Sequence, residues 1–133
     1  MGMVVKLAAG IVLALLTACA PSSSCTAPRL TPSYLPPGLH RVATAALVAG
    51  TRHSTWSGRG RFVQILEDVN ADLGEDAKPT TVRGFAALYG ATGLPEAPLG
   101  VEWHDKCGTA YAVLARGLPA AEVVKIANGL RAR

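Results

Sequence analysis

A short apolar segment near the N-terminus limits how much of this 133-residue chain can belong to a folded domain. Residues 7–16 read LAAGIVLALL and follow a short segment whose only charge is Lys6. A helix needs about 20 apolar residues to span a bilayer, so this segment is too short to be a membrane anchor. Its length and basic flank are typical of a secretory signal peptide. We therefore expect residues 1–18 to be removed and one domain to form from the remainder.

The residues behind this segment indicate how the chain is anchored. Leu16-Thr17-Ala18-Cys19 resembles the lipobox of bacterial lipoproteins, which has an aliphatic residue, two small residues and a cysteine. The resemblance implies that the Cys19 thiol receives a diacylglyceryl group, that cleavage occurs before Cys19, and that the new amino terminus is often acylated. An ordinary secretory cleavage site beside an incidental cysteine is the alternative. The resemblance predicts a lipid-anchored protein on the extracytoplasmic face of a cell membrane or an outer membrane.

Two cysteines remain once Cys19 carries lipid. Cys25 and Cys107 are an even number in a compartment that permits disulfides, so we expect them to form one bridge. Such a bridge would close a loop of about 80 residues and would stabilise the fold by about 4 kcal/mol. The alternative is two free thiols, with Cys25 in a linker and Cys107 as a small buried residue.

The segment after Cys19 is poor in residues that a core could bury. Residues 20–37 contain five prolines among serines and threonines. This composition favours an extended chain of about 3.1 Å per residue. We therefore expect a lipid-anchored linker over 19–37 and a single domain over 38–133.

This domain is predicted to be α+β, with a small antiparallel sheet and one C-terminal helix packed on it. Alternating apolar residues predict strands over 41–48, 61–69 and 82–89, and a hairpin of 101–104 with 111–115. Glycine, proline and polar residues predict loops over 51–60, 70–79 and 90–100. After Pro119, apolar residues follow helical spacing at Val123, Ile126, Ala127 and Leu130. The sheet is the natural surface on which this apolar stripe is buried.

Both ends of the domain resemble a small domain of unknown function. The C-terminal motifs are Val101-x-Trp103, Gly108-x-x-Tyr111-x-Val113, Gly117-Leu118, Glu122 and Lys125-Ile126-Ala127-x-x-Leu130. Near the start, Leu35-Pro36-Pro37-Gly38 matches the Leu-Pro-x-Gly motif that often opens such domains. Domains of this kind occur in cell-envelope lipoproteins and in the part of anti-sigma-factor-like proteins that lies outside the membrane. The resemblance implies an envelope location and a regulatory role. It assigns no catalytic residue, because the family has none established.

One acidic motif is similar to the start of a calcium-binding loop. Asp68-x-Asn70-x-Asp72 matches the first three ligand positions of an EF-hand loop. Leu73 stands where glycine should follow, and Pro79 stands where a bidentate carboxylate should close the coordination shell. We therefore predict a solvated loop without a tight calcium site, and no metal or other cofactor.

A basic turn is the candidate binding surface. Trp56, Arg59 and Arg61 lie within six residues that also contain two glycines. Outside the membrane we expect no nucleic acid partner, so an envelope protein, an anionic lipid or a wall polymer is the predicted partner. A glycine-rich hairpin with ordinary solvated arginines is the alternative.

The predicted function is a non-enzymatic binding or accessory module of the cell envelope. A small envelope hydrolase is the alternative, for which Ser54, His104 and Asp105 would have to meet in a triad. No GxSxG motif supports that triad, and the three histidines lack the spacing of a metal-binding helix.

Overall fold

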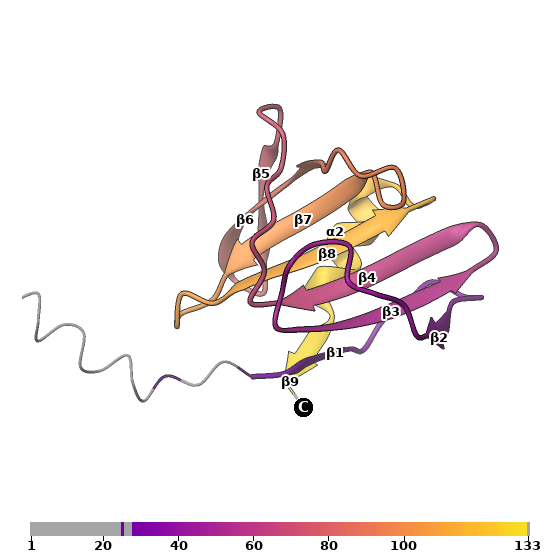
Figure 1. Cartoon of the computed structure of the whole chain (residues 1–133). Coiled ribbons are helices and arrows are strands. Elements are labelled where there is room, and N and C mark those ends of the chain that lie inside the picture. The colour runs from indigo at the N-terminus through magenta and orange to yellow at the C-terminus, as the bar shows by residue number, and fades with distance from the viewer. Residues whose placement is uncertain (1–24, 26–27, 133) are drawn as a thin grey trace, which may run out of the picture.

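The computed structural model describes Cys25 and residues 28–132 (Figure 1). The strands are β1 (Leu30–Pro32), β2 (His40–Val42), β3 (Arg52–Gly58), β4 (Arg61–Glu67), β5 (Lys78–Val82), β6 (Phe85–Ala91), β7 (Leu99–His104), β8 (Ala110–Arg116) and β9 (Leu130–Ala132), and the helix is α2 (Ala120–Asn128). Seven strands form one antiparallel sheet in the order β2-β3-β4-β8-β7-β6-β5, and β1 pairs separately with β9. This confirms the predicted α+β class, with a sheet and one C-terminal helix.

Helix α2 covers one face of the large sheet. Its apolar stripe, Val123, Ile126 and Ala127, is fully buried. The stripe packs against inward-facing residues of the sheet, including Val63, Val101 and Val113. Burying a valine or isoleucine side chain stabilises a fold by about 1.5–3 kcal/mol, so this stripe is the main reason that the helix stays on the sheet.

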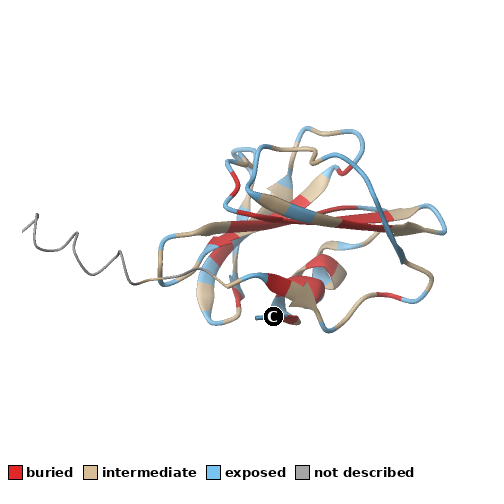
Figure 2. Cartoon of the chain, turned by 60° about the horizontal axis from the view of Figure 1, so that its bottom comes forward, coloured by how far each residue is buried: buried red, intermediate tan, exposed pale blue. Residues whose placement is uncertain are grey.

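Loops cover the opposite face, as Figure 2 shows. A second apolar cluster there is centred on Phe62, Leu66 and Leu114, and it includes Leu47 and Leu94 from the loops. The fully buried Gln64 side chain forms two hydrogen bonds with the backbone of the loop between β2 and β3. Its Oε1 accepts a hydrogen bond from the Leu47 amide (2.8 Å), and its Nε2 donates to the Ala45 carbonyl (3.0 Å). A buried amide is stable here because the loop satisfies its hydrogen-bonding groups.

The fold begins earlier in the chain than the boundary expected at residue 38. Residues 30–32 form β1, which runs antiparallel to β9, and the buried Leu30 amide donates to Glu67 Oε2 (3.1 Å). Proline is compatible with so short a strand, because Pro32 stands at its end and removes only one backbone donor. The expected linker over 19–37 is therefore corrected: residues 28–37 belong to the folded part.

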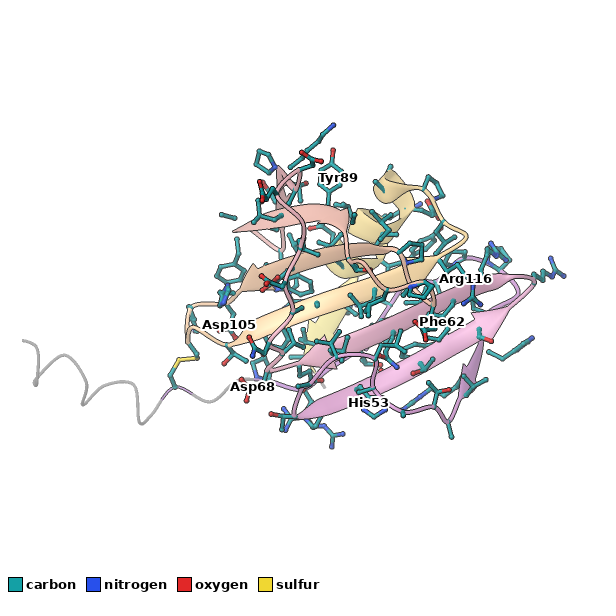
Figure 3. The ribbon with its side chains drawn as sticks, turned by 45° about the horizontal axis from the view of Figure 1, so that its top comes forward. His53, Phe62, Asp68, Tyr89, Asp105 and Arg116 are labelled. Carbon is teal, nitrogen blue, oxygen red and sulfur yellow. A yellow bond between two sulfur atoms is a disulfide. The ribbon has the colours of Figure 1, made fainter. Side chains whose placement is uncertain are left out.

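A disulfide joins this N-terminal segment to the turn between β7 and β8. Cys25 and Cys107 are bonded with their Cα atoms 5.6 Å apart (Figure 3). Close by, the Tyr111 hydroxyl lies 3.2 Å from the Pro28 carbonyl and 3.3 Å from Asp105 Oδ2. The covalent bond and the β1–β9 pairing together fix the segment against one end of the sheet.

The predicted strands differ from the structure in three places. Most of 41–48 is a loop, because only His40–Val42 pairs with β3. The segment expected to be a loop over 51–60 contains strand β3. The single strand expected over 82–89 is the hairpin of β5 and β6, which turns at Arg83 (φ 53°) and Gly84 (φ 86°). Two successive residues with positive φ are typical of a tight two-residue hairpin turn. The hairpin of β7 with β8 and the helix after Pro119 are confirmed.

Gln64→Leu should lower the free energy of unfolding by about 2 kcal/mol, because the Leu47 amide and Ala45 carbonyl lose their partner while side-chain volume is kept. Urea denaturation measures this difference. Thr81→Val, at an exposed β5 position, is the control and should change stability by less than about 0.5 kcal/mol. Equal effects of the two substitutions would contradict the role assigned to Gln64.

Cys107→Ser should lower the free energy of unfolding by about 4 kcal/mol, because it opens a loop closed over 82 residues. The Cys25→Ser/Cys107→Ser double variant should match the single variant. In non-reducing peptide mapping, one peptide should join the N-terminal segment to the β7–β8 turn. Two alkylatable thiols in protein taken directly from the envelope would contradict the bridge.

Candidate functional site

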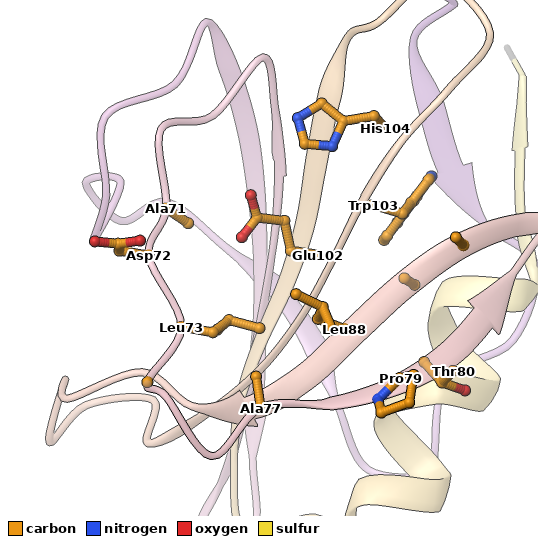
Figure 4. A pocket seen from close by; sticks show the side chains of 13 residues that line it. Ala71, Asp72, Leu73, Ala77, Pro79, Thr80, Leu88, Glu102, Trp103 and His104 are labelled. Carbon is orange, nitrogen blue, oxygen red and sulfur yellow. The ribbon is translucent and has the colours of Figure 1, made fainter.

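An open groove lies on the loop-covered face, between residues 71–77 and strands β5, β6 and β7 (Figure 4). Its cavity volume is about 480 Å³. Most of the lining is apolar and includes Leu73, Ala77, Pro79 and Leu88. Asp72, Glu102 and His104 are the titratable residues of the lining. A volume of this size, an apolar lining and a few polar groups are typical of small-molecule sites.

Two paired glycines position the loop that forms one wall of the groove. Gly90 of β6 and Gly100 of β7 face each other in the sheet. A Cβ atom on Gly90 would lie 2.9 Å from the Ala77 Cα, and one on Gly100 would lie 3.3 Å from Leu73 Cδ2. The loop therefore rests directly on the sheet at this point, and the Gly74 amide donates to the Ala91 carbonyl (3.0 Å). The groove opens beside that contact, over the neighbouring residues of β6 and β7.

Glu102 is the carboxylate that the groove partly buries. Burial raises the pKa of its carboxyl above the usual value, because the charged form loses solvation. The nearby His104 lowers this pKa and the negative charge of Asp72 raises it. Glu102 and His104 alternate with the buried Val101 and Trp103 along β7, so both side chains face the groove. The groove therefore holds two carboxyl groups, those of Glu102 and Asp72, and the imidazole of His104.

The residues of the calcium-like motif have separate roles. Asp68 has a positive φ of 54°, and its Oδ2 accepts a hydrogen bond from Thr51 Oγ1 (2.8 Å). Asp72 instead lines the groove, across from Glu102 (Figure 4). Within Cys25 and residues 28–132, no three His, Cys, Asp or Glu side chains are grouped closely enough to hold a metal ion. The absence of a tight calcium site in solution remains a prediction.

The structure does not bring Ser54, His104 and Asp105 together. His104 lines the groove, whereas Ser54 lines a small cavity beside Trp56 on the helix-covered side. Asp105 stabilises the β7–β8 turn: its Oδ1 accepts hydrogen bonds from the amides of Cys107 (2.8 Å) and Thr109 (3.0 Å). Burial and the Asp105 carboxylate also raise the pKa of Tyr111 to about 12. Both carboxylate oxygens of Asp105 thus accept hydrogen bonds from the β7–β8 turn and from Tyr111.

Of the candidate binding surface, only Arg59 is exposed. Trp56 retains 8% of its surface and packs in the core, and the guanidinium of the exposed Arg41 lies 5.2 Å from its ring centroid. Arg61 donates a hydrogen bond to the Pro37 carbonyl and so connects β4 to the N-terminal segment. Arg59 occupies the β3–β4 turn with a positive φ of 55°. Trp56 and Arg61 therefore have structural roles, which corrects the expected three-residue surface.

The groove was not predicted from the sequence, although part of it could have been. Alternation over 101–104 places Glu102 and His104 on one face, opposite the buried Trp103, and this signal was available. Leu88, 47% exposed in the groove, carries no such signal, because residues 85–89 are all apolar or aromatic and show no alternation with polar residues.

No protein-family model, curated protein or solved structure matches this chain. The lipobox, including Cys19, lies outside the residues that the structure describes. The part of the chain that the structure describes contains no helix that is long and apolar enough to span a bilayer.

Glu102→Gln should raise the melting temperature by about 2 °C at pH 7 and by less at pH 4. A carboxyl whose pKa is raised by folding stabilises the fold below its unfolded pKa, and this contribution is lost as pH rises through the folded pKa. Glutamine stays neutral throughout, so the variant avoids that loss. Thermal unfolding followed by circular dichroism at both pH values measures the effect. Glu96→Gln, an exposed acid outside the groove, is the control. A gain for Glu102→Gln that is equal at both pH values would contradict this assignment.

Proposed function

We propose that this protein is a lipoprotein anchored through Cys19 on the extracytoplasmic face of a cell membrane or outer membrane, where it acts as a non-enzymatic binding or accessory module. The observation that carries the binding role is the groove, whose described lining combines an apolar floor with Asp72, Glu102 and His104. Its one hydroxyl side chain, Thr80, lies at the other end from His104 (Figure 4). This chemistry supports binding over acyl transfer, which needs an activated nucleophile. A regulatory role in the envelope, as in the family that the domain resembles, is the sharper form of the proposal.

The disulfide supports a specific orientation on the membrane. Cys25 lies six positions after Cys19, and a fully extended chain of six residue steps spans about 20 Å. Because Cys25 is bonded to Cys107, the β7–β8 turn stays within that distance of the lipid. Lys106 is exposed in this turn and Arg29 is exposed on the segment bound beside it. The end of the sheet that carries these two cations faces the membrane.

The exposed arginine of the β3–β4 turn is then directed away from the lipid. Arg61 and Glu67 are the two ends of β4, and Glu67 pairs with Tyr111 near the disulfide. Six residue steps along a strand span about 20 Å, so Arg59 lies about that far from the disulfide-linked end of the sheet. An envelope protein or a wall polymer suits this position better than a lipid headgroup does.

Cys19→Ala should abolish incorporation of a fatty-acid probe in growing cells and leave the protein unprocessed or in the soluble extracytoplasmic fraction. Cys25→Ala is the matched control, because it removes a cysteine six positions away and leaves the lipobox intact. The control should keep the label. Label that persists on Cys19→Ala would overturn the anchor.

A further inference from the structure

The groove has the chemistry to distinguish between ligands by charge. Its floor is apolar, and at 47% exposure Leu88 is one of two large hydrophobic side chains that are exposed among the described residues. Its polar groups lie toward one end, where Glu102 and His104 follow each other on β7 (Figure 4). The groove therefore has an apolar part and a polar part, as a site for an amphipathic molecule requires.

The sign of the charge favours a cation. Asp72 and Glu102 bring two carboxylates to the groove, His104 brings one imidazole, and no lysine or arginine occurs among the described residues that line it. The loop that forms the wall adds Glu75 and Asp76, both exposed. These acids contrast with the net positive charge of the whole chain. An anion placed beside Glu102 would be repelled, whereas an ammonium group would be attracted.

We propose that this groove binds a small amphipathic cation, with an ammonium group beside Glu102 and Asp72 and an apolar body on Leu88 and Leu73. This inference deepens the proposed binding role and rests on it. The volume of about 480 Å³ is sufficient for such a molecule, since ligand sites range from about 300 to 1,000 Å³. The contact of the loop with Gly90 and Gly100 forms the groove without any ligand, so binding needs no large rearrangement.

Three six-carbon ligands of similar shape test the proposal: hexylammonium, 1-hexanol and hexanoate. Each is titrated into the ¹⁵N-labelled exported domain, with its disulfide intact, at pH 7, and amide shifts are followed. Hexylammonium should shift the amides of Leu73, Leu88 and Glu102. It should bind about fivefold more tightly than hexanol, an effect typical of a partly solvated ion pair, and hexanoate should bind most weakly.

Variants separate the two parts of the groove. Glu102→Gln should remove most of the preference for hexylammonium and leave hexanol binding unchanged. Leu88→Ala should weaken both ligands, and Glu96→Gln, outside the groove, should change neither. Leu88 and Glu102 are both partly exposed, so these variants should fold, and a wild-type-like amide spectrum verifies it.

Two results would overturn the proposal. Equal binding of hexylammonium and hexanol would remove the role of the carboxylates. Absence of shifts at the groove would remove the site, and a sedimenting dimer in that case would assign the groove to a second copy of the chain. Neither result would affect the anchor, because lipid labelling of Cys19 is measured separately.

Discussion

The fold depends on the fact that its two central strands are buried on both faces. Every residue of β4 after Arg61 is buried, as are the five residues of β8 between Ala110 and Arg116. One helix can cover only one of these faces, so loops must cover the other. Loops carry backbone groups that a sheet cannot pair, and burying them unpaired would be costly. The fully buried Gln64 reduces this cost, because its side chain binds one amide (Leu47) and one carbonyl (Ala45) of the loop between β2 and β3.

The loops that cover the face opposite the helix also explain where the groove lies. A helix presents a continuous apolar stripe, whereas a loop contacts the sheet only where the surface admits it. Here the contact is at Gly90 and Gly100, which have no side chain to hold Ala77 and Leu73 away. Beside that contact the sheet carries larger residues, Leu88 and Glu102, and the loop does not cover them fully. The candidate site is thus a consequence of covering half of a wide sheet with irregular chain.

Periodicity predicted those parts of the fold in which local pattern and burial agree. The stripe of Val123, Ile126 and Ala127 has helical spacing and packs as a helix, and the alternation around Trp103 and Tyr111 gives the β7–β8 hairpin. The segment 41–48 alternates equally well, yet most of it forms a covering loop, in which Leu47 and Ala45 bond to the Gln64 side chain and not to a neighbouring strand.

Other features depend on contacts that no local pattern specifies. Strand β1 lies in a proline-rich segment that gives no strand pattern, and its pairing partner, β9, lies at the other end of the described chain. Trp56 suggested a surface because its neighbours are polar, yet register places it opposite Val63 in the core. The groove depends on the path of a loop relative to β6 and β7, which the spacing of residues along the chain does not encode.

The pairing of β1 with β9 has a consequence for the order in which the molecule is assembled. Leu30 pairs with Ala132 across almost the whole described chain, and closing so long a loop is entropically costly, so we expect this pairing to form late. The large sheet and the helix can therefore form while the N-terminal segment is still detached. If the chain is anchored through Cys19 as proposed, the domain would first fold while connected to the lipid by a longer unpaired segment. When β1 pairs with β9 and Cys25 bonds to Cys107, the tether would shorten. The last step of maturation would therefore reduce the distance between the domain and the bilayer.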